Sequence, residues 1–343
     1  MDSTRTQVLI VGAGLAGTAT ATHLADRGIT PLVIERNPET SLHPKADEAL
    51  AAGLAPIGLD RARELGARVR FDTELVSFEQ DTLGVTARLA HRPTGTLSQV
   101  RADYLIAADG HHSPVSIASD TFRNGRVFLV GDAARVTPPT GEPDGGTAIA
   151  DGFDLAWKLA AVLRNQAGPG LLDSYDAERR PVAPESRVFG SRLRSAAVLI
   201  DDEDPTLTED PRRPSGRPGF RAPHVPLRQG GSTVSTVDFF GRDWVLLTGT
   251  EGGVWHEAAK HVADRLGIIV RTVGLGPGLT DPDDRLVSVY GIGHGGASLV
   301  RPDGVVAWRT DFEVADAAGT LQTVLTRLLA RVPTVAVPAG TAR

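Results

Sequence analysis

The start of this chain has an order of elements that only a few folds accept. In chain order they are an apolar run at 8–11, glycines at 12, 14 and 17, a helical segment at 15–27 closed by Gly28, and a second apolar run at 31–34. Short apolar runs of this kind form buried parallel strands, and a glycine is the usual residue after a helix. The sequence therefore predicts a βαβ unit and an α/β domain with a parallel sheet.

The spacing Gly12-x-Gly14-x-x-Gly17 is the spacing that a dinucleotide-binding turn requires. The first glycine permits a tight turn, the second lets the backbone approach a pyrophosphate, and the third lets helix and strand pack closely. The helix N-terminus then directs N–H groups at the phosphates. Glu35 follows about 20 residues later, where a carboxylate accepts hydrogen bonds from ribose. An ordinary glycine-rich loop is the alternative, and this context disfavours it.

Two later strands each end in an aspartate. Residues 105–108 lead to Asp109-Gly110, and residues 126–130 lead to Gly131-Asp132. Each motif alone also fits a turn or a helix cap. The helix expected after Gly131-Asp132 carries Trp157, expected in the core, and Lys158, expected at the surface. Together with the glycine turn, this pattern indicates two separated contacts to one long anionic cofactor, and suggests FAD rather than NAD.

The rest of the chain is expected to form more strands, further helices and a second domain. In the first domain we expect strands at 69–71, 73–78, 85–90, 100–102, 104–108 and 126–130, a hairpin turn at 93–95, and helices at 147–163 and 171–199, the latter broken near Pro181. In the second we expect strands at 244–247, 268–272 and 286–290, a hairpin at 297–308, and helices at 254–266 and 321–329. The polar segment 201–219 lacks apolar periodicity and predicts a linker. The expected division is therefore a domain at 1–200, a linker at 201–219 and a domain at 220–343.

The composition excludes several classes of function. The 343 residues are 41% hydrophobic and 23% charged, as in ordinary globular proteins, and the net charge of −6 argues against nucleic-acid binding. The chain has no cysteine, which excludes disulfides and thiolate chemistry. We expect no metal site, since no cluster has metal-ligand spacing. With no signal-peptide pattern and no apolar segment of membrane-spanning length, a cytoplasmic location is expected.

Taken together, the motifs resemble those of FAD-dependent aromatic hydroxylases of the para-hydroxybenzoate hydroxylase fold, in particular those that modify aromatic polyketides. The resemblance rests on Gly12-x-Gly14-x-x-Gly17 with Glu35-Arg36, Ala108-Asp109-Gly110-x-x-Ser113, Gly131-Asp132-Ala-Ala with Pro138-Pro139, the segment 172–181, and the tail segments 219–224, 290–292 and 301–304. It covers nearly the whole chain, and it implies a Rossmann-like FAD-binding domain built on a parallel sheet plus a β-meander. The tail resembles the family's thioredoxin-like domain, here without cysteines and so without dithiol chemistry.

The resemblance implies a set of FAD contacts. They are Gly12, Gly14, Leu15, Ala16 and Gly17 at the pyrophosphate, Glu35 at the adenosine ribose, Arg36 and the backbone of Val76 at adenine, Lys45 near the flavin, Asp109 in a motif linked to both FAD and NADPH, Asp132 at the ribityl chain, Pro139 near the isoalloxazine, and Gly145 and Gly146 in the flavin loop. NADPH or NADH would be the reductant and a small aromatic molecule the substrate. Because the flavin carries the oxygen-transfer chemistry, no catalytic side chain is named.

The chain departs from the family pattern at three places. Only residues 47–66 separate Pro44-Lys-Ala from the strand at Val69, and about a dozen residues stand where the family inserts the sheet that covers the substrate. We therefore expect that sheet to be largely absent, so that a homodimer or a partner subunit would complete the site. In the flavin loop, Glu142 and Asp144 replace glycines and would repel an anionic cofactor, an effect that Arg135 would partly offset.

Three functions remain open at this point. The first is an FAD-dependent, NAD(P)H-using monooxygenase acting on an aromatic polyketide, which the resemblance favours. The second is a non-hydroxylating family member that acts as a scaffold, helper or cyclase-like protein, which the missing sheet favours. The third, a plain NAD-linked reductase, is weakest because no Tyr-x-x-x-Lys pair follows the glycine turn and Gly131-Asp132 would have no role. A yellow purified protein would favour the first function, and a colourless one the second.

Overall fold

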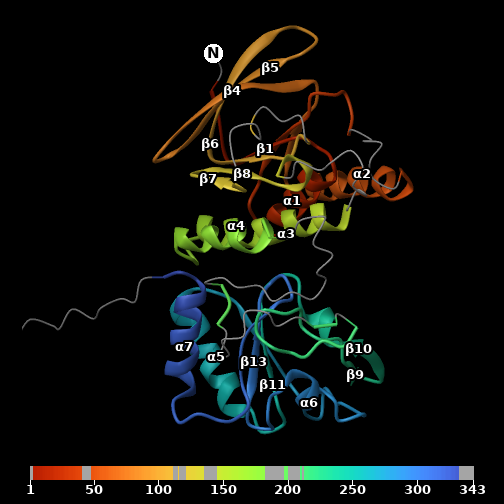
Figure 1. The fold of residues 1–343 in the computed structure, drawn as a ribbon, viewed down its shortest axis with the longest axis vertical. Coiled ribbons are helices and arrows are strands. Elements are labelled where there is room, and N and C mark those ends of the chain that lie inside the picture. The colour runs from red at the N-terminus through yellow and green to blue at the C-terminus, as the bar shows by residue number, and fades with distance from the viewer. Residues whose placement is uncertain are drawn as a thin grey trace, which may run out of the picture. The chain divides into compact units, whose positions relative to one another are not determined.

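The structure is a computed structural model, shown in Figure 1. It describes residues 3–40, 48–110, 115, 121–134, 145–181, 197–199, 209–210 and 212–331. The chain forms two compact units. Unit 1 comprises Met1–Arg164 and Leu172–Phe189, and unit 2 comprises Asn165–Leu171 and Gly190–Arg343.

Unit 1 is built on one sheet, to which every strand described in this unit belongs. The strands are β1 Ser3–Val11, β2 Leu32–Ile34, β3 Arg68–Arg70, β4 Thr73–Asp81, β5 Gly84–His91, β6 Thr96–Ala107, β7 Arg123–Asn124 and β8 Val127–Leu129. The order is β3-β2-β1-β6-β5-β4, and β8 pairs with β6 and β7. Strands β3, β2, β1, β6 and β8 are parallel, whereas β4, β5 and β6 form an antiparallel meander. The predicted parallel sheet with a β-meander is confirmed.

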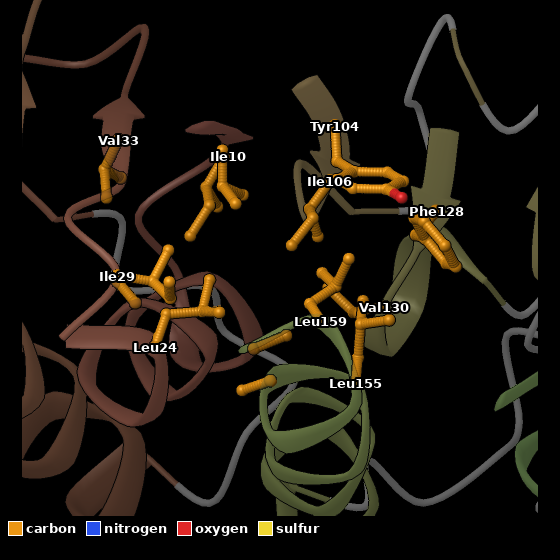
Figure 2. Packing of buried hydrophobic residues seen from close by; sticks show 14 of the residues in the cluster. Ile10, Leu24, Ile29, Val33, Tyr104, Ile106, Phe128, Val130, Leu155 and Leu159 are labelled. Atoms are coloured by element: carbon orange, nitrogen blue, oxygen red, sulfur yellow. The ribbon is translucent and has the colours of Figure 1, made fainter. Parts of the chain in front are cut away.

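The helices of unit 1 fix the layers of the domain. They are α1 Leu15–Asp26, α2 Glu48–Glu64, α3 Gly145–Leu163 and α4 Asp173–Arg179. Figure 2 shows Ile10 and Phe128 of the sheet pointing towards Leu24 of α1 and Leu155 of α3, and all four are buried in one cluster. Burial of each large side chain contributes roughly 1.5–3 kcal/mol. The same cluster therefore fixes α1 and α3 against the strand ends that carry the motifs.

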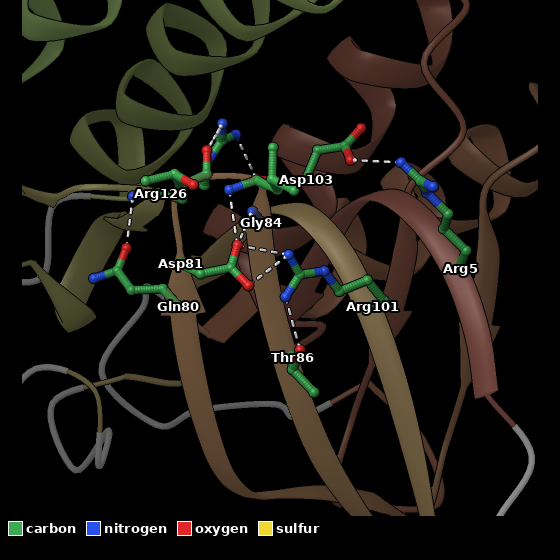
Figure 3. A network of polar contacts seen from close by, with 10 residues as sticks. Arg5, Gln80, Asp81, Gly84, Thr86, Arg101, Asp103 and Arg126 are labelled. Carbon is green, nitrogen blue, oxygen red and sulfur yellow. Dashed lines mark hydrogen bonds and ion pairs between the residues drawn. The ribbon is translucent and has the colours of Figure 1, made fainter.

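A polar network joins the meander to the start of β8, as Figure 3 shows. The Asp81 carboxylate accepts hydrogen bonds from the Arg101 guanidinium at 2.7 and 2.9 Å and from the N–H of Leu83 and of Gly84. The Arg101 hydrogen bond is the main reason that the pKa of Asp81 is lowered to about 2. Arg126 donates to the carbonyl of Asp103 at 3.1 Å. These contacts hold the β4–β5 turn beside the segment that leads to the Gly131 turn.

Some boundaries in unit 1 differ from those predicted. The two strands predicted at 100–102 and 104–108 form one strand, β6, because residues on both sides of Asp103 pair with β1, Ala102 with Thr6 and Tyr104 with Val8. The helix predicted at 171–199 ends at Arg179, just before Pro181, which has no N–H to donate. Residues 197–199 are not helical, and residues 182–196 lie outside the described residues.

Unit 2 has the connectivity of the thioredoxin-like fold that the resemblance implied. Its elements are the hairpin β9 Pro226–Gln229 and β10 Ser232–Ser235, then β11 Trp244–Thr248, α5 Gly253–Leu266, β12 Val270–Gly274, α6 Leu286–Tyr290, β13 Ala297–Val300, β14 Val306–Thr310 and α7 Ala317–Leu328. The main sheet has the order β12-β11-β13-β14, with β11 and β12 parallel and the other pairs antiparallel.

The strand expected at 286–290 is wrong, since these residues form the short helix α6. The Asp281 carboxylate accepts hydrogen bonds from the N–H of Arg285 at 2.7 Å and of Leu286 at 2.6 Å, which caps the helix N-terminus. Gly291 ends the helix at φ 60°, the left-handed conformation common at helix C-termini. None of the described helices combines the length and apolar composition needed to cross a membrane.

Candidate cofactor site

The glycine turn joins β1 to α1 and packs against the end of β6. Gly12 has φ 104°, and a Cβ atom there would lie 2.5 Å from the carbonyl oxygen of Ala108. A Cβ atom on Gly17 would lie 2.0 Å from the carbonyl oxygen of Gly12. The first and third glycines of the motif are therefore required by the packing of the protein itself.

Gly14 differs from its two neighbours in the motif. It is the N-cap of α1 with ordinary extended backbone angles, φ −74° and ψ −174°, which any residue adopts. A Cβ atom there would meet no atom of the described residues within 4 Å. Neither strain nor packing in the described protein explains a glycine here, whereas close approach of a ligand to the backbone does.

Glu35 ties the end of β2 to the glycine turn. Its side chain is buried, and its Oε2 accepts a hydrogen bond from the N–H of Ala13 at 2.8 Å. Its Oε1 accepts from the backbone N–H and the side-chain Nδ2 of Asn37, at 3.0 and 2.9 Å. A carboxylate has about four acceptor positions, so these three hydrogen bonds leave capacity for a ribose hydroxyl. Arg36 is exposed on the same loop.

The Gly131–Asp132 turn lies directly against the glycine turn, although more than a hundred residues separate the two in sequence. A Cβ atom on Gly131, which has φ 59°, would lie 2.8 Å from the Cβ of Ala16. A Cβ atom on Gly145, at the start of α3, would lie 3.1 Å from a methyl group of Leu15. Asp132 is exposed in the short 3-10 turn Gly131–Ala133. The structure thus brings the two motifs together at one place.

The remaining residues of the predicted site divide into two groups. Asp109 follows β6 and is half-buried, next to Ala108, whose N–H donates to the carbonyl of Val11 at 2.8 Å. Val76 is the residue that the β4–β5 register skips between Leu75 and Ser77, and it is 54% exposed. Gly146 is exposed in the first turn of α3. Lys45 and Pro139 lie outside the described residues, as do Arg135, Glu142 and Asp144.

Two buried ion-pair clusters that involve α3 were missed from the sequence. The carboxylate of Asp151 on α3 accepts a hydrogen bond from the N–H of Gly131 at 3.2 Å and one from Arg179 at 2.7 Å. Lys158, expected at the surface, is fully buried and pairs with Asp154 at 2.8 Å and with Glu178 at 3.0 Å. The spacing of Asp154 and Lys158, four residues apart on a helix, was a signal for that pair. Only the fold brings Arg179 to Asp151.

Comparison with known proteins identifies the family of this chain. The FAD binding domain family matches residues 5–50, 52–120 and 116–187, and the family of the aromatic-ring hydroxylase C-terminal domain matches residues 215–332. The chain belongs to the FAD-dependent aromatic-ring hydroxylases. Membership confirms the resemblance drawn from the motifs, and FAD is the cofactor of the family.

Two curated hydroxylase relatives and one solved structure are similar to this chain. Aklavinone 12-hydroxylase RdmE from Streptomyces purpurascens is 34% identical, covering 96% of this chain and 100% of the relative. Tetracenomycin A2 monooxygenase-dioxygenase from Streptomyces glaucescens is 32% identical, covering 84% of this chain and 76% of the relative. The crystal structure of aklavinone-11 hydroxylase with FAD and aklavinone is 34% identical with a TM-score of 0.88, covering 96% of this chain and 100% of that chain.

The comparisons also show that this hydroxylase is short for its family. The alignment with RdmE spans 538 residues and this chain has 343, so at least 195 aligned positions, the difference between the two, have no residue here. The match to the FAD binding domain breaks between residues 50 and 52 and again at 116–120. These breaks fall in the two stretches where the sequence predicts shortening.

Proposed function

We propose that this hydroxylase binds FAD between its two glycine motifs, takes reducing equivalents from NADPH or NADH, and inserts oxygen into an aromatic polyketide. The contact between Gly131 and Ala16 carries the proposal, because it places two separate nucleotide motifs at one site. The substrate class is supported by the two relatives, an aklavinone 12-hydroxylase and a tetracenomycin A2 monooxygenase-dioxygenase. The scaffold or helper alternative is not favoured.

In this proposal each described residue of the site has a binding role. The open backbone at Gly14 and the first N–H groups of α1 hold the pyrophosphate, where the helix dipole favours negative charge. Glu35 accepts from the adenosine ribose, and the exposed Asp132 accepts from the ribityl hydroxyls. Bound flavin supplies hydride acceptance and oxygen transfer. The residues of the chain orient it and restrict the access of water.

We further propose that a second chain, either another copy or a partner subunit, completes the substrate site. The missing aligned positions support this, since relatives of full length hold residues there that this chain lacks. The domain limits 1–200 and 220–343, with a linker at 201–219, belong to the same proposal. The matches to two separate family domains, up to residue 187 and from residue 215, support these limits.

An oxygenation assay tests the function. Purified protein is loaded with FAD, reduced anaerobically with NADPH or NADH, and then mixed with oxygen and a polycyclic aromatic compound such as aklavinone. We expect a yellow protein, oxidation of the reduced nucleotide and, in the presence of the completing chain, a product carrying one added oxygen atom in its mass spectrum. A colourless protein that ignores added FAD would support the helper alternative instead.

A further inference from the structure

The Gly131 turn is held from the protein side by a buried ion pair. Oδ2 of Asp151 accepts the N–H of Gly131 at 3.2 Å, and Oδ1 of the same carboxylate accepts from Nε of Arg179 at 2.7 Å. Asp151 is fully buried, and the Arg179 side chain is 12% exposed. A buried carboxylate is costly unless it is paired with a charge. Arg179 therefore supplies the charged partner that a buried carboxylate needs at the place where Asp151 holds the turn.

Helix α4 also holds the strand that leads into the turn. The hydroxyl of Tyr175 donates to the carbonyl of Leu129 at 2.7 Å, and the Asp176 carboxylate accepts from the N–H of Phe122 at 2.7 Å. Phe122 and Leu129 face each other and share one backbone hydrogen bond of 2.9 Å. Side chains of α4 thus bind the two remaining backbone groups of this pair, the N–H of Phe122 and the carbonyl of Leu129. Leu129 stands two residues before Gly131.

These contacts help to fix the orientation of the Gly131 turn. Gly131 is in the left-handed region at φ 59°, and the next side chain, Asp132, is exposed. The buried contacts reach the backbone of Leu129 and Gly131, whereas the Asp132 side chain is exposed. Helix α4 can therefore set the direction of Asp132 without contacting a ligand itself.

We propose that Asp151 and Arg179 are positioning residues for the flavin half of the cofactor site. They hold the Gly131 turn so that Asp132 meets the ribityl chain, and this inference rests on the proposed FAD binding. The adenosine half of the site, made by the turn at 12–17 and Glu35, is tied to β2 and β6 through separate contacts. ADP, which lacks the ribityl chain, should therefore bind independently of Asp151 and Arg179.

Calorimetric titration with FAD and with ADP tests this separation. Asp151→Asn replaces one acceptor oxygen by a donor group, so only one of its two donors stays satisfied. Arg179→Gln removes the compensating charge, whereas Arg179→Lys keeps the charge. We expect Asp151→Asn and Arg179→Gln to weaken FAD binding by about tenfold or more, with ADP affinity within about twofold of wild type and with partial rescue by Arg179→Lys. Arg61→Gln, which removes an exposed ion pair with Glu64 on α2, is the matched control and should leave both affinities unchanged.

Each result has a separate meaning. Unchanged FAD affinity in both variants overturns the positioning role, and so does an equal loss of FAD and ADP, which would mark a purely structural role. Tyr175→Phe provides a milder test, because it removes only the hydroxyl that donates to Leu129, and it should weaken FAD but not ADP. If wild type binds neither compound, the proposed cofactor site itself is wrong.

Discussion

At the residue scale, the three glycines of the first motif have different physical reasons to be glycine. Gly12 and Gly17 are fixed by contacts within the protein, whereas no described atom lies within 4 Å of the Cβ position of Gly14. The sequence shows only their spacing and cannot separate these reasons, because the separation depends on where Ala108 and the Gly12 carbonyl lie in the fold. The spacing, with its strand–helix context and Glu35, predicts a nucleotide turn, and its contacts with FAD stay a prediction. The role of each glycine in the fold cannot be read from that pattern.

Gly14→Ala is the substitution that separates cofactor binding from folding. Its backbone angles suit alanine and no described atom lies within 4 Å of the new Cβ. We expect the free energy of unfolding of the apoprotein to change by no more than about 0.5 kcal/mol. FAD affinity should fall by roughly tenfold or more, about 1.4 kcal/mol, because the methyl group meets the pyrophosphate. Urea denaturation and FAD titration measure the two effects.

Gly17→Ala and Gly253→Ala are the controls for that substitution. The first places a Cβ 2.0 Å from the Gly12 carbonyl and should destabilise the protein by about 1–3 kcal/mol or more. The second is at the start of α5 in open space and should affect neither folding nor FAD. Unaltered FAD affinity in Gly14→Ala would remove the pyrophosphate from this turn.

At the element scale, the contact between α1 and α3 contains a titratable side chain, His23. His23 of α1 stacks on Phe153 of α3 with ring centroids 4.3 Å apart, and Arg27 lies over the same ring. Burial is the main reason that the pKa of His23 is lowered from 6.5 to about 4, and the Arg27 charge adds to it. The neutral imidazole is therefore the form that this helix pair accepts.

This lowered pKa predicts acid sensitivity in a defined window. Because the folded pKa is below the unfolded one, the unfolded chain binds more protons between pH 6.5 and 4. The stabilisation is complete above pH 6.5 and is lost as the pH falls towards 4, by roughly 3 kcal/mol in total. Denaturation of wild type, His23→Gln and the exposed His261→Gln across this range measures it. The dependence of the free energy of unfolding on pH should weaken only in His23→Gln. An equal dependence in all three proteins would exclude His23 as its source.

The sequence predicts an element well where an apolar pattern runs over several residues and a glycine follows it. Segment β1–α1–β2 and helix α5 are examples, since apolar periodicity and a following glycine mark them. Helix α6 was misassigned because Leu-Val-Ser-Val-Tyr is rich in β-branched and aromatic residues, as strands are. The Asp281 carboxylate that caps this helix lies four and five residues before the N–H groups it accepts, outside the apolar segment. The hairpin β9–β10 was missed although Gly230-Gly231, both at positive φ, is a turn signal. The pairing of Asp151 with Arg179 needed the fold.

At the scale of the whole molecule, the chain keeps the cofactor-binding sheet of its family and lacks many other residues. All strands described in unit 1 belong to one sheet, and at least 195 positions aligned in RdmE have no counterpart here, given 538 aligned and 343 present. Oxygen transfer from a reduced flavin depends on the exclusion of water. The shortened chain therefore keeps the sheet of the FAD binding domain that its family model matches, and we expect it to have less with which to cover a substrate.

We accordingly expect the isolated chain to oxidise NAD(P)H with poor coupling. Most of the oxygen consumed should appear as hydrogen peroxide and little as hydroxylated product. The ratio of hydroxylated product to hydrogen peroxide measures the coupling. A lysate of the native host, or a second copy at high concentration, should raise the ratio if either supplies the missing cover. Stoichiometric hydroxylation by the isolated monomer would show that the described residues cover the substrate unaided.

The central claim is that the turn at 12–17 and the turn at 131–132 hold one FAD molecule. A crystal structure of this hydroxylase with FAD tests it most directly. The account predicts the pyrophosphate at the backbone of Gly14 and the ribityl chain at Asp132 within a single bound molecule. FAD that contacts only one of the two turns, or that binds elsewhere, would contradict it.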